Sequence, residues 1–69
     1  MKFICSCYKH TFEAETMTDA KRKASTIANR RRKAVDVLHV VEVESGISAT
    51  FLRVNKVCPN NTITRGAWA

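Results

Sequence analysis

A helix signal within residues 12–33 constrains the fold of this chain more than any other feature of its sequence. Thr16, followed three residues later by Asp19, matches a capping box, in which both side chains take up backbone N–H groups that the first helical turn leaves unpaired. We therefore predict that the helix starts at about Met17. One stripe at helical spacing is apolar and small, which indicates close packing on a sheet. It consists of Met17, Ala20, Ala24, Ile27 and Ala28.

Basic residues dominate the rest of this segment. No acidic residue occurs between residues 20 and 35, although exposed helices usually combine Glu and Lys, because oppositely charged i,i+4 pairs stabilise them. The cations at residues 30–33 suit the negative end of the helix dipole, but those at residues 21–23 lie near its positive end. We therefore expect a basic helix face that meets an anionic partner, with an ordinary solvated face as the alternative. The face consists of Lys21, Arg22, Lys23, Arg30, Arg32 and Lys33.

The chain is short and strongly basic. We expect a single domain over residues 1–69 with a thin core, because a chain of this size buries only about 60% of its unfolded surface. Twelve Lys and Arg against six Asp and Glu give a net charge of +6, and seven of the twelve lie between residues 21 and 33. A local patch of this kind steers an acidic partner better than a diffuse excess of charge does. Binding is therefore expected rather than catalysis.

The three cysteines and the N-terminal residues bear on the compartment. Three cysteines cannot all pair, and residues 3–7 are too short for the apolar region of a signal peptide. We expect a reduced, cytoplasmic protein. The longest apolar run is far shorter than a membrane span, and an alanine-rich helix face is poorly suited to a lipid interface. No membrane contact is expected.

Strand patterns precede the helix. Residues 2–8 alternate loosely in hydrophobicity and residues 11–15 extend again towards the helix cap. They form either the two strands of a hairpin or one kinked strand. Both possibilities stay open, because neither Gly nor Asn marks a tight turn between them.

The strongest strand pair follows the helix. Val37 to Glu44 is dense in β-branched residues, Ser45 and Gly46 suit a two-residue turn, and Ile47 to Val57 returns. After a loop at residues 58–61, residues 62–65 form a short last strand. The predicted class is α+β, with one helix packed on a three- to five-stranded antiparallel sheet.

Pairing of Glu44 with Ile47 divides the side chains of this hairpin between two faces. One helix covers only one of them, so the other keeps apolar groups exposed, which often marks a partner or a homodimer contact. A modest exposed patch, or cover by the termini, is the alternative. We expect Trp68 to pack on the exposed sheet face or at a helix end rather than to stack on bases.

Two catalytic or metal-binding arrangements can be drawn from the Cys and His residues. Cys5, Cys7, His10 and Cys58 offer the ligand types of a zinc site, but ligands usually come in C-x₂₋₄-C pairs, so buried free thiols are favoured. A Cys–His nucleophile pair using His10 or His39 lacks a recognisable orienting group. The two glycines provide no phosphate loop. Neither a cofactor nor a bound metal is expected.

The basic residues suit nucleic acid in a generic way, by neutralising phosphates without reading sequence. No known nucleic-acid-binding motif is present. Residues on the strands and near the C-terminus are predicted as secondary contacts if they lie on the same side. These are Arg53, Lys56, Arg65, Phe51 and Trp68.

Part of the chain resembles a known group of proteins. Residues 12–16, with Asp19-Ala20-Lys21 and Ala24-Ser25, resemble the strand-into-helix motif of small phage-encoded α+β proteins, most closely type I-F anti-CRISPR inhibitors, and the turn at residues 41–46 fits the same pattern. Residues 30–33 and 58–61 have no counterpart there, so no binding residues are carried over. The resemblance implies a non-enzymatic inhibitor from a phage or mobile element that occupies a surface of a host defence complex.

Three functions are therefore expected. The first is a small protein that binds and inhibits a host nucleic-acid-processing or defence complex, protein or ribonucleoprotein, through the basic helix face. The second is a stand-alone DNA- or RNA-binding protein with weak sequence specificity. The third is a zinc-stapled or dimerising structural accessory.

Overall fold

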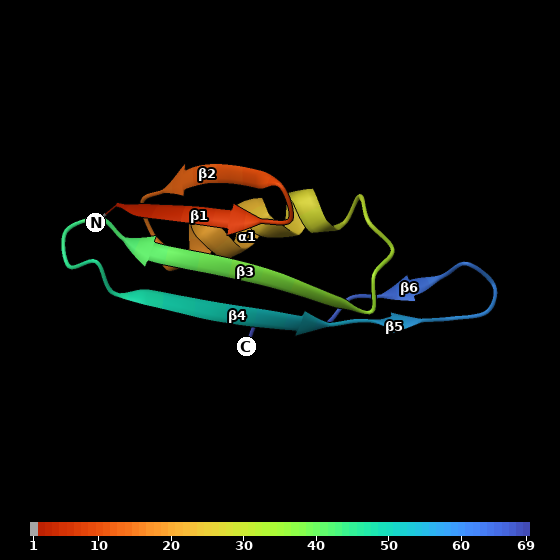
Figure 1. The fold of residues 1–69 in the computed structure, drawn as a ribbon. Helices are drawn as coiled ribbons and strands as arrows, with labels where there is room; N and C mark the ends of the chain where they lie inside the picture. The colour runs from red at the N-terminus through yellow and green to blue at the C-terminus, as the bar shows by residue number, and fades with distance from the viewer. Residues whose placement is uncertain (1) are drawn as a thin grey trace.

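In the computed structural model, which describes residues 2–69, one helix covers one face of a four-stranded antiparallel sheet (Figure 1). The strand order is β2-β1-β3-β4, and a separate two-stranded sheet, β5-β6, projects beyond one end. The predicted α+β class is confirmed. In chain order the elements are β1 (Phe3–Cys7), β2 (His10–Ala14), α1 (Met17–Ala28), β3 (Val35–Glu42), β4 (Ser48–Val54), β5 (Lys56–Val57) and β6 (Ile63–Thr64).

The two segments before the helix form a hairpin. Cys7 pairs with His10, so the turn consists of Tyr8 and Lys9. Tyr8 has φ 55°, in the left-handed region that Gly or Asn usually supplies. The Tyr8 hydroxyl donates a hydrogen bond to the buried carboxylate of Asp36, which offsets the cost of this conformation.

Helix α1 starts as predicted and ends earlier than the basic run suggested. The backbone N–H of Asp19 donates to Thr16 Oγ1 at 3.1 Å, so Thr16 is the N-cap. The helix ends at Ala28, and residues 30–33 belong to the connection to β3, so the dipole argument does not apply to them. Arg65 helps to explain why the helix ends at Ala28. Its guanidinium donates to the carbonyl oxygens of Ala28, Asn29 and Arg31 at 2.9–3.5 Å and so satisfies groups at the helix end. No helix within residues 2–69 is long and apolar enough to cross a membrane.

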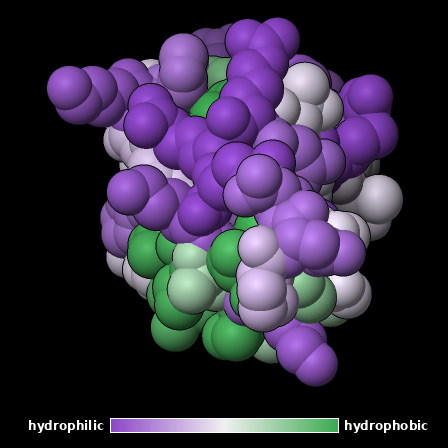
Figure 2. Space-filling model, turned by 90° about the vertical axis from the view of Figure 1, so that its right-hand side faces the viewer, coloured by the Kyte–Doolittle hydropathy of each residue, from purple (hydrophilic) through white to green (hydrophobic). Residues whose placement is uncertain are grey.

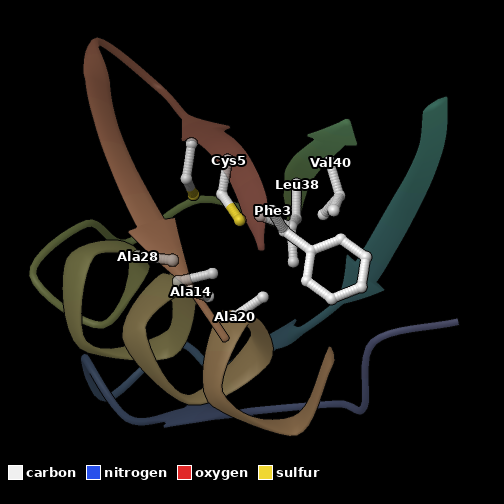
Figure 3. Packing of buried hydrophobic residues seen from close by; sticks show 9 residues of the cluster. Phe3, Cys5, Ala14, Ala20, Ala28, Leu38 and Val40 are labelled. Atoms are coloured by element: carbon white, nitrogen blue, oxygen red, sulfur yellow. The ribbon is translucent and has the colours of Figure 1, made fainter. Parts of the chain in front are cut away.

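The helix packs on the sheet through alanines (Figure 3). Ala20, Ala24 and Ala28 are fully buried, and Met17 and Ile27 are partly buried beside them, so the predicted stripe is confirmed. Methyl groups at these positions let the helix approach the strands closely. The sheet side of this core consists of Phe3, Cys5, Cys7, Ala14, Leu38 and Val40.

The β3–β4 hairpin differs from its predicted register. The Glu42 N–H donates to the Ile47 carbonyl at 2.9 Å, and a four-residue turn containing Gly46, with φ 73°, replaces the two-residue turn. The Val43 N–H donates to the Lys2 carbonyl beside β1 at 3.0 Å instead of pairing with β4. The register is therefore shifted by two residues. Because side chains alternate with a period of two, each residue stays on its predicted face.

The predicted return strand at residues 47–57 is interrupted at Asn55. This residue is buried, and its side-chain Nδ2 donates to the Lys33 carbonyl at 3.0 Å and to Asp36 at 2.7 Å. The chain therefore leaves the main sheet there. Lys56 and Val57 pair with β6 instead.

The C-terminal residues lie along the free edge of β4. Ala69 exchanges two backbone hydrogen bonds of 2.9 Å with Leu52, and Trp68 Nε1 donates to Ser25 Oγ on α1 at 3.0 Å. Trp68 therefore lies on the covered face against the last turn of α1, so the expected position at a helix end is confirmed and the exposed sheet face is not used. Gly66 explains the path, because a Cβ there would lie 2.1 Å from the Val54 carbonyl oxygen, and only glycine lets the chain pass so close.

Candidate anion-binding site

The predicted basic residues form two separate groups. Residues 21–23 lie in the first half of α1, and residues 30–33 follow its last turn. At a rise of about 1.5 Å per residue, Arg22 and the position of Arg30 are about 12 Å apart along the helix axis. The single helix face expected from the sequence is therefore not formed.

The cations in the first half of α1 have counter-charges of their own. Arg22 forms an ion pair with Asp19, and Lys23 Nζ lies 3.2 Å from Asp19 Oδ2. Hydrogen bonds from Arg22 and Lys23 lower the pKa of the Asp19 carboxyl. Lys21 Nζ lies 4.8 Å from the centre of the Phe51 ring. The absence of acids from residue 20 onwards therefore does not leave this half of the helix without counter-charges, and the i,i+3 and i,i+4 spacing of Arg22 and Lys23 from Asp19 was the signal in the sequence.

A second group of cations gathers at the other end, where β1 finishes, β3 starts and β5 departs. We call these six exposed residues the cationic end: Lys9, Arg30, Arg31, Arg32, Lys33 and Lys56. They come from three separate segments, namely the β1–β2 turn, the α1–β3 connection and β5. Within residues 2–69 none of the six forms an ion pair with Asp or Glu. Figure 2 views the molecule from this end and shows hydrophilic side chains over much of it, with a hydrophobic area below.

The acidic residues lie away from the cationic end. Five of the six lie at or near the end of β2, the start of α1 and the β3–β4 turn. These five are Glu13, Glu15, Asp19, Glu42 and Glu44. Four cations lie in the same half of the molecule as these five acids and nearly balance their charge. The sixth acid, Asp36, is buried with Arg53 and Arg65. The charges outside the cationic end therefore cancel, and its six cations account for the net charge of +6.

Arg53, predicted as a secondary contact, is not available to a partner. Its side chain is 3% exposed, and its guanidinium lies 2.8 Å from the fully buried Asp36 carboxylate. It also donates to Ser25 and Asn29 of the helix segment. An inward position on β4 explains this, since its cross-strand neighbour is Asp36. The prediction for Arg53 is wrong.

The other predicted secondary contacts differ in exposure. Lys56 is exposed and belongs to the cationic end, whereas Arg65 is half-buried against backbone carbonyls. Phe51 is partly buried beside Lys21. Trp68 is partly buried with the Arg53 guanidinium 5.0 Å from its ring centre. The structure therefore brings only Lys56 of this set to the candidate site.

The backbone beneath the cationic end is held by a buried polar network that sequence reasoning missed. Asp36 is fully buried and accepts hydrogen bonds from Tyr8, Arg53 and Asn55. Burial acts to raise the pKa of Asp36, but these donors outweigh it and lower the pKa. Burial and the Asp36 carboxylate together raise the pKa of Tyr8 to about 12. The Tyr8 ring in turn supports Arg31, whose guanidinium carbon lies 4.7 Å from the ring centre.

The cysteines and histidines do not form one cluster, although Cys7 and His10 are cross-strand neighbours. Cys5 and Cys7 are buried under α1, and burial raises the pKa of both thiols, so they are protonated at neutral pH. Cys58 lies in the loop after β5, while His10 and His39 are exposed on the sheet. Within residues 2–69 no group of three or more His, Cys, Asp or Glu side chains is placed to hold a metal ion.

No family model, curated protein or solved structure matches this chain.

Proposed function

We propose that this protein binds the phosphate backbone of nucleic acid through its cationic end. The supporting observation is the segregation of charge: three segments distant in sequence bring six exposed cations together, and the five acids other than the buried Asp36 lie elsewhere. Neutralising phosphates with such side chains releases condensed counterions, which gives affinity without sequence reading.

Several contacts fix the backbone of the cationic end before an anion binds. Four consecutive cations at residues 30–33 repel one another, and a free loop would have to be ordered on binding. Arg65 holds the Asn29 and Arg31 carbonyls, and Asn55 holds the Lys33 carbonyl. The backbone groups are thus occupied from within. The exposed guanidinium groups remain free to take phosphate oxygens in bidentate fashion.

The test is a salt titration of binding to a fluorescein-labelled duplex of arbitrary sequence, followed by anisotropy. We expect the logarithm of the association constant to fall linearly with the logarithm of salt concentration, by about 0.9 per neutralised phosphate. The triple variant Arg30→Gln, Arg32→Gln, Lys33→Gln should flatten this slope by about 2.7, the value for three lost phosphate contacts.

A matched control separates the site from net charge. The variant Lys21→Gln, Arg22→Gln, Lys23→Gln removes the same three charges from the helix and should keep the wild-type slope to within about one phosphate contact. Equal losses in the two triple variants, or no binding by the wild type at low salt, would show that the cationic end is not a nucleic-acid site.

A second proposal follows from the resemblance to phage anti-CRISPR inhibitors: the cationic end occupies an acidic surface of a host defence complex. In support, β2 leads through the Thr16 cap into α1 and antiparallel strands follow, which is the element order that the resemblance implies. Pull-down from a bacterial lysate with and without nuclease distinguishes the two proposals. Partners that persist after nuclease support a protein target, and partners lost with nuclease support nucleic acid.

A further inference from the structure

The sheet face opposite α1 carries a row of uncovered aliphatic side chains. Val35, Val37 and Leu52 are each 46–47% exposed, and Val54 is 68% exposed. Val35 pairs with Val54 and Val37 pairs with Leu52, so these four form one continuous patch on β3 and β4. Figure 1 views the sheet from this open side, with α1 behind it. A patch of this kind on a small domain typically marks a contact surface.

The aliphatic surface continues towards the other end of the face. Ile4 is 37% exposed and pairs with Val41 across β1 and β3. Between it and the first patch lie Ser6, His39 and Thr50, and the Nδ1 and Oγ1 atoms of the last two are hydrogen-bonded to each other at 3.0 Å. Polar atoms that are already paired cost less to bury than free ones. The β3–β4 part of the face is therefore suited to being covered, while Thr11 and Glu13 of β2 form a polar edge beside it.

We propose that a second copy of this chain covers this face, with the two sheets packed face to face and their strands antiparallel. The inference goes beyond the proposed function and does not depend on it. Sheets that pack in this way bring the apolar side chains of both faces into one core layer.

The distribution of charge selects the antiparallel arrangement. Strands running the same way would place two cationic ends against each other, which like charges oppose. In the antiparallel arrangement a twofold axis lies between the two faces and runs perpendicular to the strands, near the centre of the β3–β4 ladder. Rotation about this axis places the strands of one copy antiparallel to those of the other. Glu44, in the turn between β3 and β4, then approaches Lys33 and Lys56 of the other copy. The Val35–Val54 pair then lies over the Val41 end of the partner's face.

The size of the face is that of a small interface. β3 spans eight residues, about 27 Å, and the sheet is at most 18 Å wide, so each copy offers about 500 Å² and the pair buries about 1,000 Å², the lower bound for a specific interface. A homodimer using the same surface on both copies forms a closed twofold assembly.

Sedimentation equilibrium of the full chain tests the dimer. The 7.8-kDa chain should sediment at twice its mass at micromolar concentrations. Val37→Lys places a charge in the centre of the apolar patch and should raise the dimer dissociation constant at least about tenfold, since an unpaired charge is costly to bury. Thr26→Lys adds the same charge on the exposed side of α1 and should leave the dimer unchanged. Circular dichroism checks that both variants fold.

Zero-length carbodiimide cross-linking tests the orientation in a mixture of ¹⁴N- and ¹⁵N-labelled chains. Glu44 and Lys56 of one copy are separated by at least the seven residues of β4, about 24 Å, so a cross-link between them forms only between copies. We expect Glu44 to join to Lys56 or Lys33 in mixed-isotope peptides. A monomeric wild type, a dimer that survives Val37→Lys, or a dimer without these cross-links would overturn the proposal.

Discussion

At the scale of single residues, Asp36 joins three separate parts of the fold. Its carboxylate is fully buried and receives donors from the β1–β2 turn, from β4 and from Asn55, where the chain leaves the sheet. A buried charge is tolerated only when its partners are complete, and removing one member of the pair leaves the other without compensation. Asp36 and Arg53 therefore depend on each other.

We predict that Asp36→Asn lowers the free energy of unfolding by about 3–5 kcal/mol at pH 7, because the Arg53 guanidinium is then buried without a counter-charge. Urea denaturation followed by circular dichroism measures the change. Glu15→Gln removes one negative charge from the exposed segment between β2 and α1 and should change stability by less than about 1 kcal/mol. Similar effects of the two substitutions would mean that the buried pair does not stabilise the fold.

The same carboxylate sets a dependence on pH. The pKa of Asp36 is lowered in the folded chain, so its contribution to stability is complete above the ordinary value of 3.8 and is lost as pH falls below that value through the folded pKa. Urea midpoints of wild type and Asp36→Asn should therefore differ at pH 7 and converge in strong acid. A constant difference down to pH 2 would contradict this assignment.

The sequence does not predict the role of Asp36, because its strand signal starts at Val37 and nothing near Arg53 in the sequence marks it as buried. Asp36 shares its parity with the inward Leu38 and Val40, and the register places it opposite Arg53. An acid and a base at facing inward positions predict a buried pair. That inference requires the extent and register of β3, which depend on tertiary contacts.

At the scale of elements, the contact between α1 and the sheet depends on small side chains. Ala24 is fully buried at the centre of the helix stripe. We predict that Ala24→Leu destabilises the fold by about 1–3 kcal/mol, because extra methylene groups force the helix away from the strands. Thr26→Leu, on the exposed side of the same helix, is the control and should stay within about 0.5 kcal/mol of the wild type in urea denaturation. If Ala24→Leu proved neutral, the close helix–sheet packing would be wrong.

The start of α1, its alanine stripe and the strand segments on either side of it followed from local patterns, since capping, helical spacing and β-branched runs act within a few residues, although the pairing of β1 with β2 stayed open. The end of the helix and the interruption at Asn55 did not. Both depend on partners far along the chain: Arg65 takes the last carbonyls of the helix, and Asn55 reaches Lys33. The same distant contacts arrange the cationic end. Its cations were recognisable in the sequence, but its separation from residues 21–23 was not.

The C-terminal segment is a separate element with one critical position. Gly66→Ala would place a Cβ 2.1 Å from the Val54 carbonyl oxygen, so the segment has to move and Trp68 should lose its contacts with Ser25 and Arg53. We expect a red-shifted tryptophan emission and a weaker near-ultraviolet circular dichroism signal. Ala67→Ser, at the exposed neighbouring residue, should leave both spectra unchanged. An unchanged emission in Gly66→Ala would show that the close approach does not fix Trp68.

At the scale of the whole molecule, the proposed dimer would carry its cationic ends at opposite poles. We predict that the wild type captures a second, labelled duplex on an immobilised one, because each end can take a separate phosphate backbone. Val37→Lys should lose this bridging while keeping single-duplex binding, and the Gln variant of residues 30, 32 and 33 should weaken both. Bridging by monomeric Val37→Lys would place two binding surfaces on one chain.

The elongated shape also decides which charge an approaching polyanion meets. At physiological ionic strength electrostatic potentials decay over about 8 Å, whereas the molecule is 45 Å long. The five acids and four cations of the opposite half are then screened from anything that touches the cationic end, which acts as an independent positive surface. In dilute buffer the screening length grows towards about 30 Å, and the six cations of the cationic end then orient a polyanion before contact.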